Sequence, residues 1–478
     1  MRANTDKKRL IAVIITFLCL PLVVMAVLVV FAFALPAQYG ETFLGELKYK
    51  AERLRDTDGK RIIVIGGSSV AFGQDSALIE KYLPEYSVVN FGLYGDLGTK
   101  LMLDLAEREI RRDDIVIVSP EQDGQTLSLF FSGSTAWQAF DGDFSLLRGV
   151  KSEDAGALVG AFPQFAGRKA GYCITGSPEP SDVYRRASFE EHGDIKVGLR
   201  PYNIMPAGSD VTRKVSFSEA VVENDFIEYL NAFAKSLRSR GASVYYRLCP
   251  INAAAIEDGG DADAFYDYMY DALDFEFIGN PHNSVIAPEY FYDSNFHLND
   301  SGVVVNTYNL IRDVKAVIGD SSPTDIAIPP PPEAPPVATD GDNSDEGMFV
   351  YEDTEKGCRI VGLTSDGKTR KKLTVPALHD GKAVIGFTQN AFAGATELEE
   401  LVLQENVGMI EDRSFEDCRS LEKVILLHSA PNKCIPGGDL FGSAKFGIYV
   451  PRKLLKSYRV SYFWAEYASR IYAAEVIA

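Results

Sequence analysis

Two segments far apart in the chain carry residues that could perform chemistry at a serine. The first is "IIVIGGSSVAFG", residues 62–73, an apolar run that ends in two glycines and two serines. The second is "YFYDSNFHLNDSG", residues 290–302, in which Asp293 lies four positions before His297. A serine becomes a nucleophile only when a base lies within hydrogen-bonding reach and a further group orients that base. These segments supply all three groups.

The elements around the first segment decide what its serines can do. Residues 62–65 have the β-branched content of a strand, and residues 76–83 have the pattern of a helix start, so the serines are expected on a β-to-α turn. In an open α/β sheet, ligands bind beyond the carboxyl ends of the strands. The alternative is a structural glycine-rich turn with a serine that caps the helix.

Strand and helix patterns alternate along the next part of the chain. Strands are expected at 62–67, 86–92, 113–120 and 242–250, and helices at 77–83, 99–110, 226–241 and from 300 to before 320. This alternation predicts an α/β fold with a parallel sheet and helices on both faces. The stretch 130–215 is irregular, and we expect it to contribute loops over the site.

These segments resemble the SGNH (GDSL-like) hydrolase superfamily, which has a three-layer, flavodoxin-like parallel sheet. The family block "GDS" corresponds to Gly67-Ser68-Ser69, so the resemblance implies that Ser69 is the nucleophile. The "GSS" variant is similar to that of membrane-anchored DltD and alginate-acetylation relatives. The block "D..H" corresponds to Asp293 and His297, with one extra residue between them.

The resemblance also implies an oxyanion hole. The second family block resembles "VVNFGLYGDLG", in which Gly95, or Gly92 as the alternative, would supply a backbone N–H. The asparagine of the third block is missing from "PEQDGQ", and Gln122 or Gln125 would supply the carboxamide instead. The family chemistry needs no metal or cofactor.

The N-terminus has the composition of a membrane anchor. Residues 10–35 contain no charged residue, and about 20 apolar residues suffice to cross a bilayer as a helix. Basic residues precede this segment, which predicts that residues 1–9 are cytoplasmic, that residues 10–35 span the membrane and that the chain after residue 36 is extracellular. A cleaved signal peptide is the alternative, although its apolar region is usually only about 7–15 residues long. Residues 36–59 are expected to form a stalk helix.

A composition change separates the α/β unit, residues 60–319, from the C-terminal region. Residues 320–347 are rich in proline and then acidic, which predicts a semi-rigid linker. Few contacts should therefore cross it, and we expect a chain that ends near Asp320 to fold and to keep any activity on a small ester.

An internal repeat of 23 residues follows in residues 348–478. Four pairs of apolar residues keep this spacing: Phe392 and Phe415, Leu398 and Leu421, Leu401 and Val424, and Leu403 and Leu426. Such a period is typical of stacked units of one strand and one turn. The segments "NAFAGATELEELVLQENVGMIEDRSFEDCRSLEKVIL" and "GIYVPRKLLKSY" resemble the BspA-type leucine-rich repeats, which implies a short β-solenoid. Residues 347–372 and a final helix at 462–474 are expected to cap it.

Composition excludes several classes of function. The 478-residue chain has a net charge of −19 and no basic run, which argues against a nucleic-acid partner. Its six cysteines form no CxxC pair, although a disulfide between Cys418 and Cys434 is compatible with the sequence. A phosphatase or nuclease would need carboxylate and histidine metal ligands that are not grouped here.

We therefore predict a membrane-anchored, extracytoplasmic serine esterase or O-acyltransferase that acts on acyl esters, acetyl esters in particular, of a cell-wall or surface glycan. A membrane partner that donates acyl groups is compatible with this function. The alternative is a non-catalytic surface adhesin with a degenerate SGNH domain.

Overall fold

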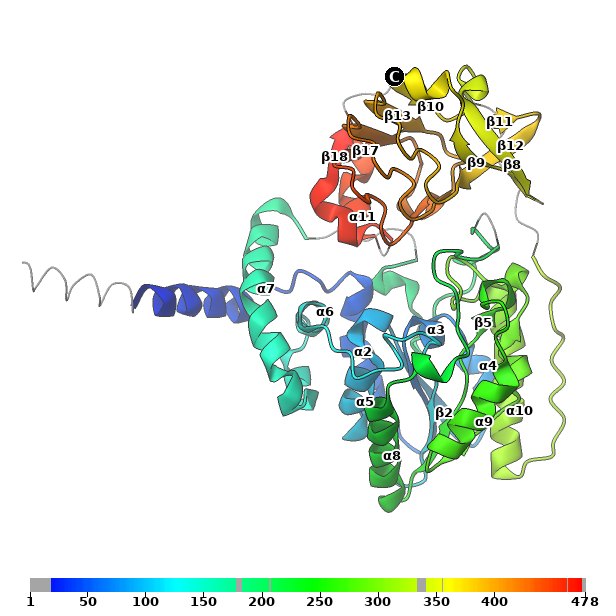
Figure 1. Ribbon diagram of the computed structural model, residues 1–478. Helices are drawn as coiled ribbons and strands as arrows, with labels where there is room; N and C mark the ends of the chain where they lie inside the picture. The colour runs from blue at the N-terminus through cyan, green and yellow to red at the C-terminus, as the bar shows by residue number, and fades with distance from the viewer. Residues whose placement is uncertain are drawn as a thin grey trace, which may run out of the picture.

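The computed structural model describes residues 19–177, 183–205, 208–332, 341–354, 356–461 and 463–474. Figure 1 shows three parts: an α/β domain, a repeat module that lies over one end of it, and a single helix, residues 19–34, that projects from the body.

The α/β domain is built on five parallel strands in the order β2-β1-β3-β4-β6. The strands are β1 (Lys60–Gly66), β2 (Tyr86–Gly92), β3 (Ile115–Val118), β4 (Ser243–Tyr246) and β6 (Glu276–Phe277). β1 and β3 are almost entirely buried, as their continuous aliphatic runs require in a sheet covered on both faces. The predicted parallel α/β sheet is confirmed.

Alternate residues of β1 face two different layers of helices. Ile62 and Val64 pack in one cluster with residues of α4 and α10, whereas Ile63 and Ile65 pack in another cluster with residues of α2, α5 and α8. The helices are α2 (Glu46–Asp56), α3 (Ser68–Ala71), α4 (Ser76–Tyr82), α5 (Thr99–Glu107), α6 (Gly133–Phe140), α7 (Ala155–Thr175), α8 (Asn224–Ser239), α9 (Ala262–Ala272) and α10 (Asp300–Ile318). A short pair, β5 (Ile251–Asn252) and β7 (Val285–Ile286), lies apart from the main sheet.

Three expectations for the first 215 residues either differ from the structure or concern residues that are only partly described. The segment expected as a stalk, residues 36–59, contains α2, whose Leu47 and Leu54 are fully buried in the domain core. The irregular stretch 130–215 contains the helices α6 and α7. Of the apolar segment 10–35, residues 19–34 are helical and the part before residue 19 lies outside the described residues. Within the described part of the chain, no helix has both the length and the hydropathy of a membrane span.

The repeat module consists of two sheets, and for most of its length successive strands of the chain alternate between them. One is all parallel, in the order β10 (Lys372–Thr374), β13 (Glu400–Leu403), β15 (Lys423–Leu426), β17 (Gly447–Pro451) and β18 (Ile471–Ala474). The other has the order β16 (Ile435–Pro436), β14 (Met409–Ile410), β12 (Lys382–Phe387), β9 (Gly357–Leu363) and β8 (Phe349–Thr354), with β11 (Leu378–His379) beside β12.

The predicted 23-residue repeat is confirmed by strand register. Leu401 pairs with Val424 and Leu403 pairs with Leu426 across β13 and β15. The prediction of a helix at 462–474 is wrong. Instead, β18 pairs in parallel with β17 and hydrogen-bonds to its edge. At the other end, β8 and β9 form an antiparallel pair within the expected cap. All six cysteines are free thiols, Cys418 and Cys434 included.

The repeat module packs directly on the α/β domain, contrary to the expectation that few contacts cross between them. One buried apolar cluster joins Met205 and Phe291 of the α/β domain to Met409 and Ile435 of the module. Each of these four side chains is at most 3% exposed. The linker therefore connects two units that share a core, and a chain that ends at Asp320 would expose this apolar face.

Met205 tests this shared core. We expect Met205→Glu to destabilise the docked state by at least about 2 kcal/mol, because a carboxylate buried without a partner loses its hydration. Met205→Leu should keep the wild-type stability within about 1.5 kcal/mol, since it conserves volume. Urea unfolding monitored by fluorescence should give one transition for wild type and Met205→Leu and two for Met205→Glu. A single unshifted transition for Met205→Glu would show that the contact does not couple the units.

Candidate active site

A row of three buried polar side chains lies at the carboxyl end of β1. Ser68 is the first residue of α3, and its Oγ lies 2.8 Å from Nε2 of His297. The other ring nitrogen, Nδ1, lies 2.8 Å from Oδ1 of Asp293. Ser68 is 2% exposed, His297 1% and Asp293 0%. When Asp293 accepts a hydrogen bond from Nδ1–H, the lone pair of Nε2 is free to take the proton of the serine, as serine nucleophile chemistry requires.

The serine in this row is Ser68, not Ser69. The Ser69 hydroxyl is buried, has no hydrogen-bond partner among the described residues, and lines a separate cavity of only about 10 Å³ beside Arg247 and Asn306. Neighbouring residues on a helix point about 100° apart, so only one of two adjacent serines can face His297. The structure therefore brings Ser68, and not the predicted Ser69, to His297.

The predicted Asp293 and His297 pair meets as expected, despite the extra residue between them. The turn that carries them is closed by the Tyr292 N–H, which donates to the His297 carbonyl at 2.8 Å, and by a bridge between Phe291 and Leu298. The ring of Phe72 stacks on the His297 ring with centroids 4.2 Å apart. This stacking fixes the imidazole plane and excludes water from one face.

Tyr184 is a fourth member of the row that the sequence did not reveal. Its hydroxyl donates to Oδ2 of Asp293 at 2.6 Å and lies 3.2 Å from Nδ1 of His297. Asp293 thus has both oxygens bonded, which holds the carboxylate in the plane that serves His297. Tyr184 lies in the irregular stretch 130–215, where no local pattern indicates a site.

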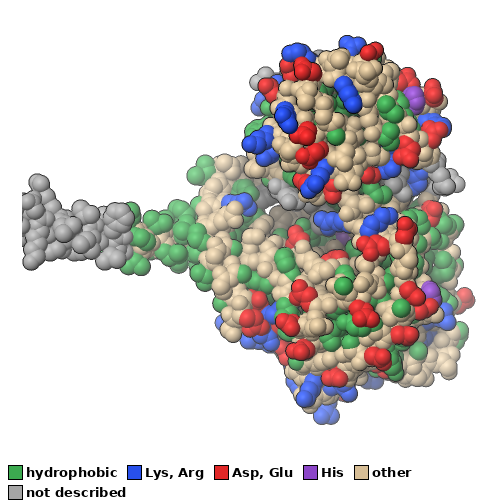
Figure 2. All heavy atoms as spheres, viewed as in Figure 1, with side chains coloured by type: hydrophobic (Ala, Val, Ile, Leu, Met, Phe, Trp, Pro, Cys, Tyr) green, Lys and Arg blue, Asp and Glu red, His purple; other side chains and the backbone are tan. Residues whose placement is uncertain are grey.

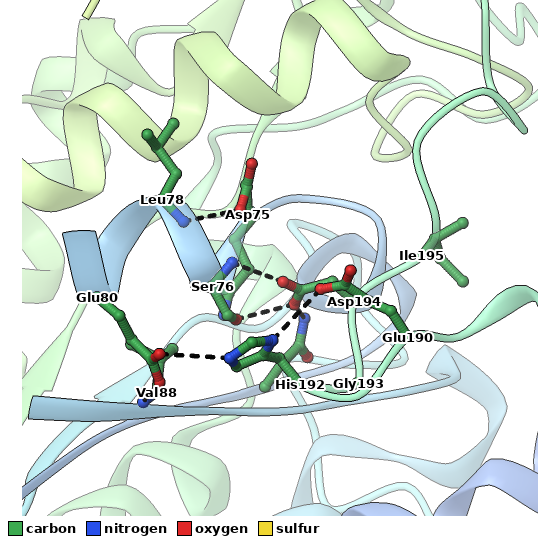
Figure 3. A network of polar contacts seen from close by, with 12 residues as sticks. Asp75, Ser76, Leu78, Glu80, Val88, Glu190, His192, Gly193, Asp194 and Ile195 are labelled. Atoms are coloured by element: carbon green, nitrogen blue, oxygen red, sulfur yellow. Dashed lines mark hydrogen bonds and ion pairs between the residues drawn. The ribbon is translucent and has the colours of Figure 1, made fainter.

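A buried polar network ties the loop that follows Tyr184 to the sheet (Figure 3). Asp194 accepts hydrogen bonds from the Ser76 N–H at 2.6 Å and from the Asn90 side chain at 2.7 Å. Burial raises the pKa of Asp194, and these hydrogen bonds oppose the rise. Beneath it, the Lys50 ammonium donates to the carbonyls of Asn90 and Gly193 at 3.0 and 2.6 Å, and burial lowers its pKa to about 7.

The carboxylate of Glu121 occupies the position where an oxyanion donor was expected. Its Oε1 accepts hydrogen bonds from Ser68 Oγ at 2.7 Å and from the Ser69 N–H at 2.8 Å. Ser68 has a single hydroxyl proton, so Glu121 and His297 Nε2 compete for it. A Cβ at Gly67 would lie 2.9 Å from Oε1, and one at Gly95 would lie 2.8 Å from Oε2. A side chain at either glycine would therefore displace the Glu121 carboxylate from this position.

The predicted oxyanion donors fall in different places. Gly95 and Gln125 line the same cavity as Ser68, and Gln125 donates to Asp96 at 3.0 Å. Gln122 points away from the site and donates to the Ser216 carbonyl at 3.1 Å. The alternative donor, the Gly92 N–H, is bonded to the Asn90 side chain at 3.1 Å.

A cavity of about 640 Å³ opens onto the row. Its walls come from both units: Ser68, Tyr94, Asp123, Arg213 and His297 belong to the α/β domain, and Pro436, Gly437, Gly438, Phe463 and Tyr467 belong to the repeat module. Burial and the charge of Glu121 raise the pKa of Asp123 to about 6. A larger hollow of about 800 Å³ lies near Ser243, where β4 begins, which is the wrong end of the strands for a ligand in this fold.

One group among the described residues has the geometry of a metal site. Glu346, His379 and Asp380 place one ligand atom each within 4.8 Å of one another in the repeat module. Glu346 and His379 already pair at 2.9 Å, and Tyr351 stacks on the His379 ring, so an ion pair accounts for the group. The group contributes nothing to the walls of the active-site cavity.

No protein-family model matches this chain, and none of the curated proteins matches it. A similarity is found to the solved structure of a leucine-rich repeat protein of T. pallidum, with 21% identity over 22% of this chain and 68% of that chain, at a TM-score of 0.16. At that score the likeness supports no inference about function.

The two serines can be distinguished chemically. We expect a fluorophosphonate probe to label the full chain and Ser69→Ala but not Ser68→Ala, because only the Ser68 hydroxyl has a base within reach. Ser69→Ala should also leave stability unchanged or slightly higher, since it removes a buried hydroxyl without a partner. Labelling followed by peptide mapping checks the site. Loss of labelling in Ser69→Ala, with labelling kept in Ser68→Ala, would reverse the assignment.

Proposed function

We propose that the protein is a membrane-anchored serine esterase or O-acyltransferase of the SGNH class, acting outside the cell on acyl esters of a surface glycan. The observation that carries this proposal is the Ser68–His297–Asp293 row, with both links at 2.8 Å, opening onto a cavity. The C-terminal module is proposed to be a BspA-type leucine-rich repeat unit, in keeping with its repeating register.

The reaction follows from the row. Ser68 Oγ attacks the ester carbonyl carbon while His297 Nε2 takes its proton, and Asp293 stabilises the imidazolium that forms. Collapse of the tetrahedral intermediate breaks the bond to the leaving oxygen, which receives the proton from His297. The acyl group then rests on Ser68 and passes to water, in an esterase, or to a glycan hydroxyl, in an acyltransferase.

The Glu121 carboxylate has to leave the Ser69 N–H before an oxyanion can form there. An ionised carboxylate on the Ser69 N–H occupies a donor and repels the negative charge of the intermediate. An amide at this position would instead donate a hydrogen bond. We propose that turnover proceeds with the Glu121 side chain displaced from the Ser69 N–H.

The cavity walls support a sugar ester as substrate. Tyr94, Phe463 and Tyr467 line the cavity with aromatic surface, while Asp123 and Arg213 supply polar groups. A ligand site of this size typically combines apolar faces with a few polar groups that orient the ligand. The acceptor and the acyl group would both lie between the two units.

The second candidate function is a non-catalytic binding protein. It is favoured by one observation, the Glu121 carboxylate on the Ser69 N–H. In that case the cleft between the units would bind a surface glycan without turning it over, and no variant of Glu121 would restore chemistry.

Replacing Glu121 with an amide tests both candidates. We expect Glu121→Gln to raise kcat/KM for 4-nitrophenyl acetate at neutral pH by at least about tenfold, because one oxyanion donor is worth about 10²–10³ in rate. Asp123→Asn is the matched control, since it removes a nearby charge without supplying the donor at Ser69. Absence of turnover and of probe labelling in both wild type and Glu121→Gln would favour the binding protein.

Phe463 tests whether the repeat module helps to bind substrate. Its ring lines the cavity and meets the Tyr184 ring edge-on, with centroids 6.3 Å apart. We expect Phe463→Ala to lower kcat/KM for an acetylated oligosaccharide about tenfold, or ~1.4 kcal/mol, and to leave 4-nitrophenyl acetate turnover within about twofold. Tyr472→Ala, an exposed position on β18, is the control. Equal losses on both substrates would place Phe463 outside substrate selection.

A further inference from the structure

The helix α7 presents an exposed apolar face that the proposed catalytic function does not use. Its buried face packs on the domain through Leu158, Phe162, Phe165, Ala166 and Lys169. Outside this buried stripe, Val159 is 70% exposed and Ile174 is 88% exposed. The helix contains no aspartate or glutamate, although the whole chain carries a net charge of −19.

The position of α7 relative to the projecting helix is fixed by buried contacts. The Lys169 ammonium donates to the Ala32 carbonyl at 2.8 Å and pairs with Asp141 at 2.6 Å. The ring of Phe33 stacks on the ring of Phe162, with centroids 6.2 Å apart. Figure 1 shows α7 running across the inner end of the projecting helix rather than along it.

The projecting helix itself has the surface of a lipid-facing segment. Large apolar side chains are exposed along it: Leu20, Leu22, Val23, Val24, Met25, Val27, Val29, Val30 and Phe33. Figure 2 shows this helix as an apolar projection, in contrast to the charged surfaces of the repeat module and the α/β domain. If the projecting helix inserts into a membrane, α7, which crosses the base of that helix and turns apolar side chains outward, would lie parallel to the membrane surface.

We propose that the exposed face of α7 rests in the headgroup region of the bilayer, as a second membrane contact beside the N-terminal anchor. Val159 and Ile174 enter the boundary between headgroups and acyl chains, and the exposed Arg168 pairs with lipid phosphates. The absence of acidic residues from α7 fits an anionic surface that would repel the rest of the chain. This inference rests on the anchoring part of the proposed function but not on its chemistry.

Two contacts constrain orientation more strongly than one. A single helix lets the body rotate and tilt, whereas an interfacial helix across its base fixes one side of the domain to the surface. The active-site cavity, between the α/β domain and the repeat module, is then held at a set height over the membrane. The substrate class that this geometry favours is a glycan chain near the membrane surface.

Native cysteines supply the probes for a test on the full chain. Cys173, on α7, and Cys19, on the projecting helix, are exposed, and the other four cysteines are buried. Cys19→Ser and Cys173→Ser each leave one exposed thiol, which is labelled with an environment-sensitive fluorophore in nanodiscs. Lipids with nitroxides in the headgroup region or deep in the acyl chains serve as quenchers. The double variant measures background labelling.

We expect the probe at Cys173 to be quenched at least about twofold by the shallow nitroxide and little by the deep one, and more strongly when phosphatidylglycerol is added to phosphatidylcholine. Val159→Asp with Ile174→Asp should remove this quenching while the probe at Cys19 and small-ester turnover stay unchanged. Tyr270→Asp, an exposed position on α9, is the control and should change none of these readouts.

Three outcomes would overturn the proposal. Quenching at Cys19 without quenching at Cys173 would show that only the anchor meets lipid. A Cys173 protected from both lipid quenchers and soluble maleimide would show that a protein, a second copy or a partner, covers α7. Absence of quenching at Cys19 would refute the anchor and α7 contact together, whereas small-ester turnover would still report separately on the proposed chemistry.

Discussion

The hydrogen bond between Ser68 Oγ and His297 Nε2 joins residues 229 positions apart in the interior of the protein. Each polar group in this row would cost about 1–3 kcal/mol if it were buried without a partner. The end of β1, the 291–298 turn and the loop that carries Tyr184 must therefore arrive together. The parallel sheet makes this convergence possible, because β1 delivers Ser68 at its carboxyl end and α10 begins just after the turn.

Features with a local cause could be predicted from the sequence. The strand and helix alternation follows from hydrophobic periodicity, and the 23-residue repeat follows from apolar spacing, so both were confirmed in the structure. The identity of the facing serine could not be predicted, because Ser68 and Ser69 have the same chemistry and differ only in direction around α3. Glu121 and Tyr184 were missed because their partners are distant in sequence. Residues 471–474 were expected in a helix, but they form a strand because they pair with the edge strand β17.

Glu121 shows how one residue type changes the electrostatics around the Ser68–His297–Asp293 row. An amide at this position would donate, whereas the carboxylate accepts from Ser68 and Ser69 at 2.7 and 2.8 Å. The raised pKa of Asp123 reports the same negative field from a second position. The site at neutral pH therefore favours a proton or a cation over an oxyanion, and the two glycines, Gly67 and Gly95, keep the space in which this carboxylate lies.

The repeat module belongs to the same functional unit as the row, although a proline-rich linker separates them in sequence. Apolar contacts through Met205, Met409 and Ile435 hold it over the carboxyl end of the sheet, and Phe463 reaches the ring of Tyr184. A substrate that enters the cavity must touch both units, so selectivity depends on a surface that the triad residues do not supply. If the domain is also fixed at α7 and the projecting helix, the cavity lies at a constant distance from the membrane. Reach to a glycan is then set by the two docked units, because the linker joins parts that already share a buried apolar cluster.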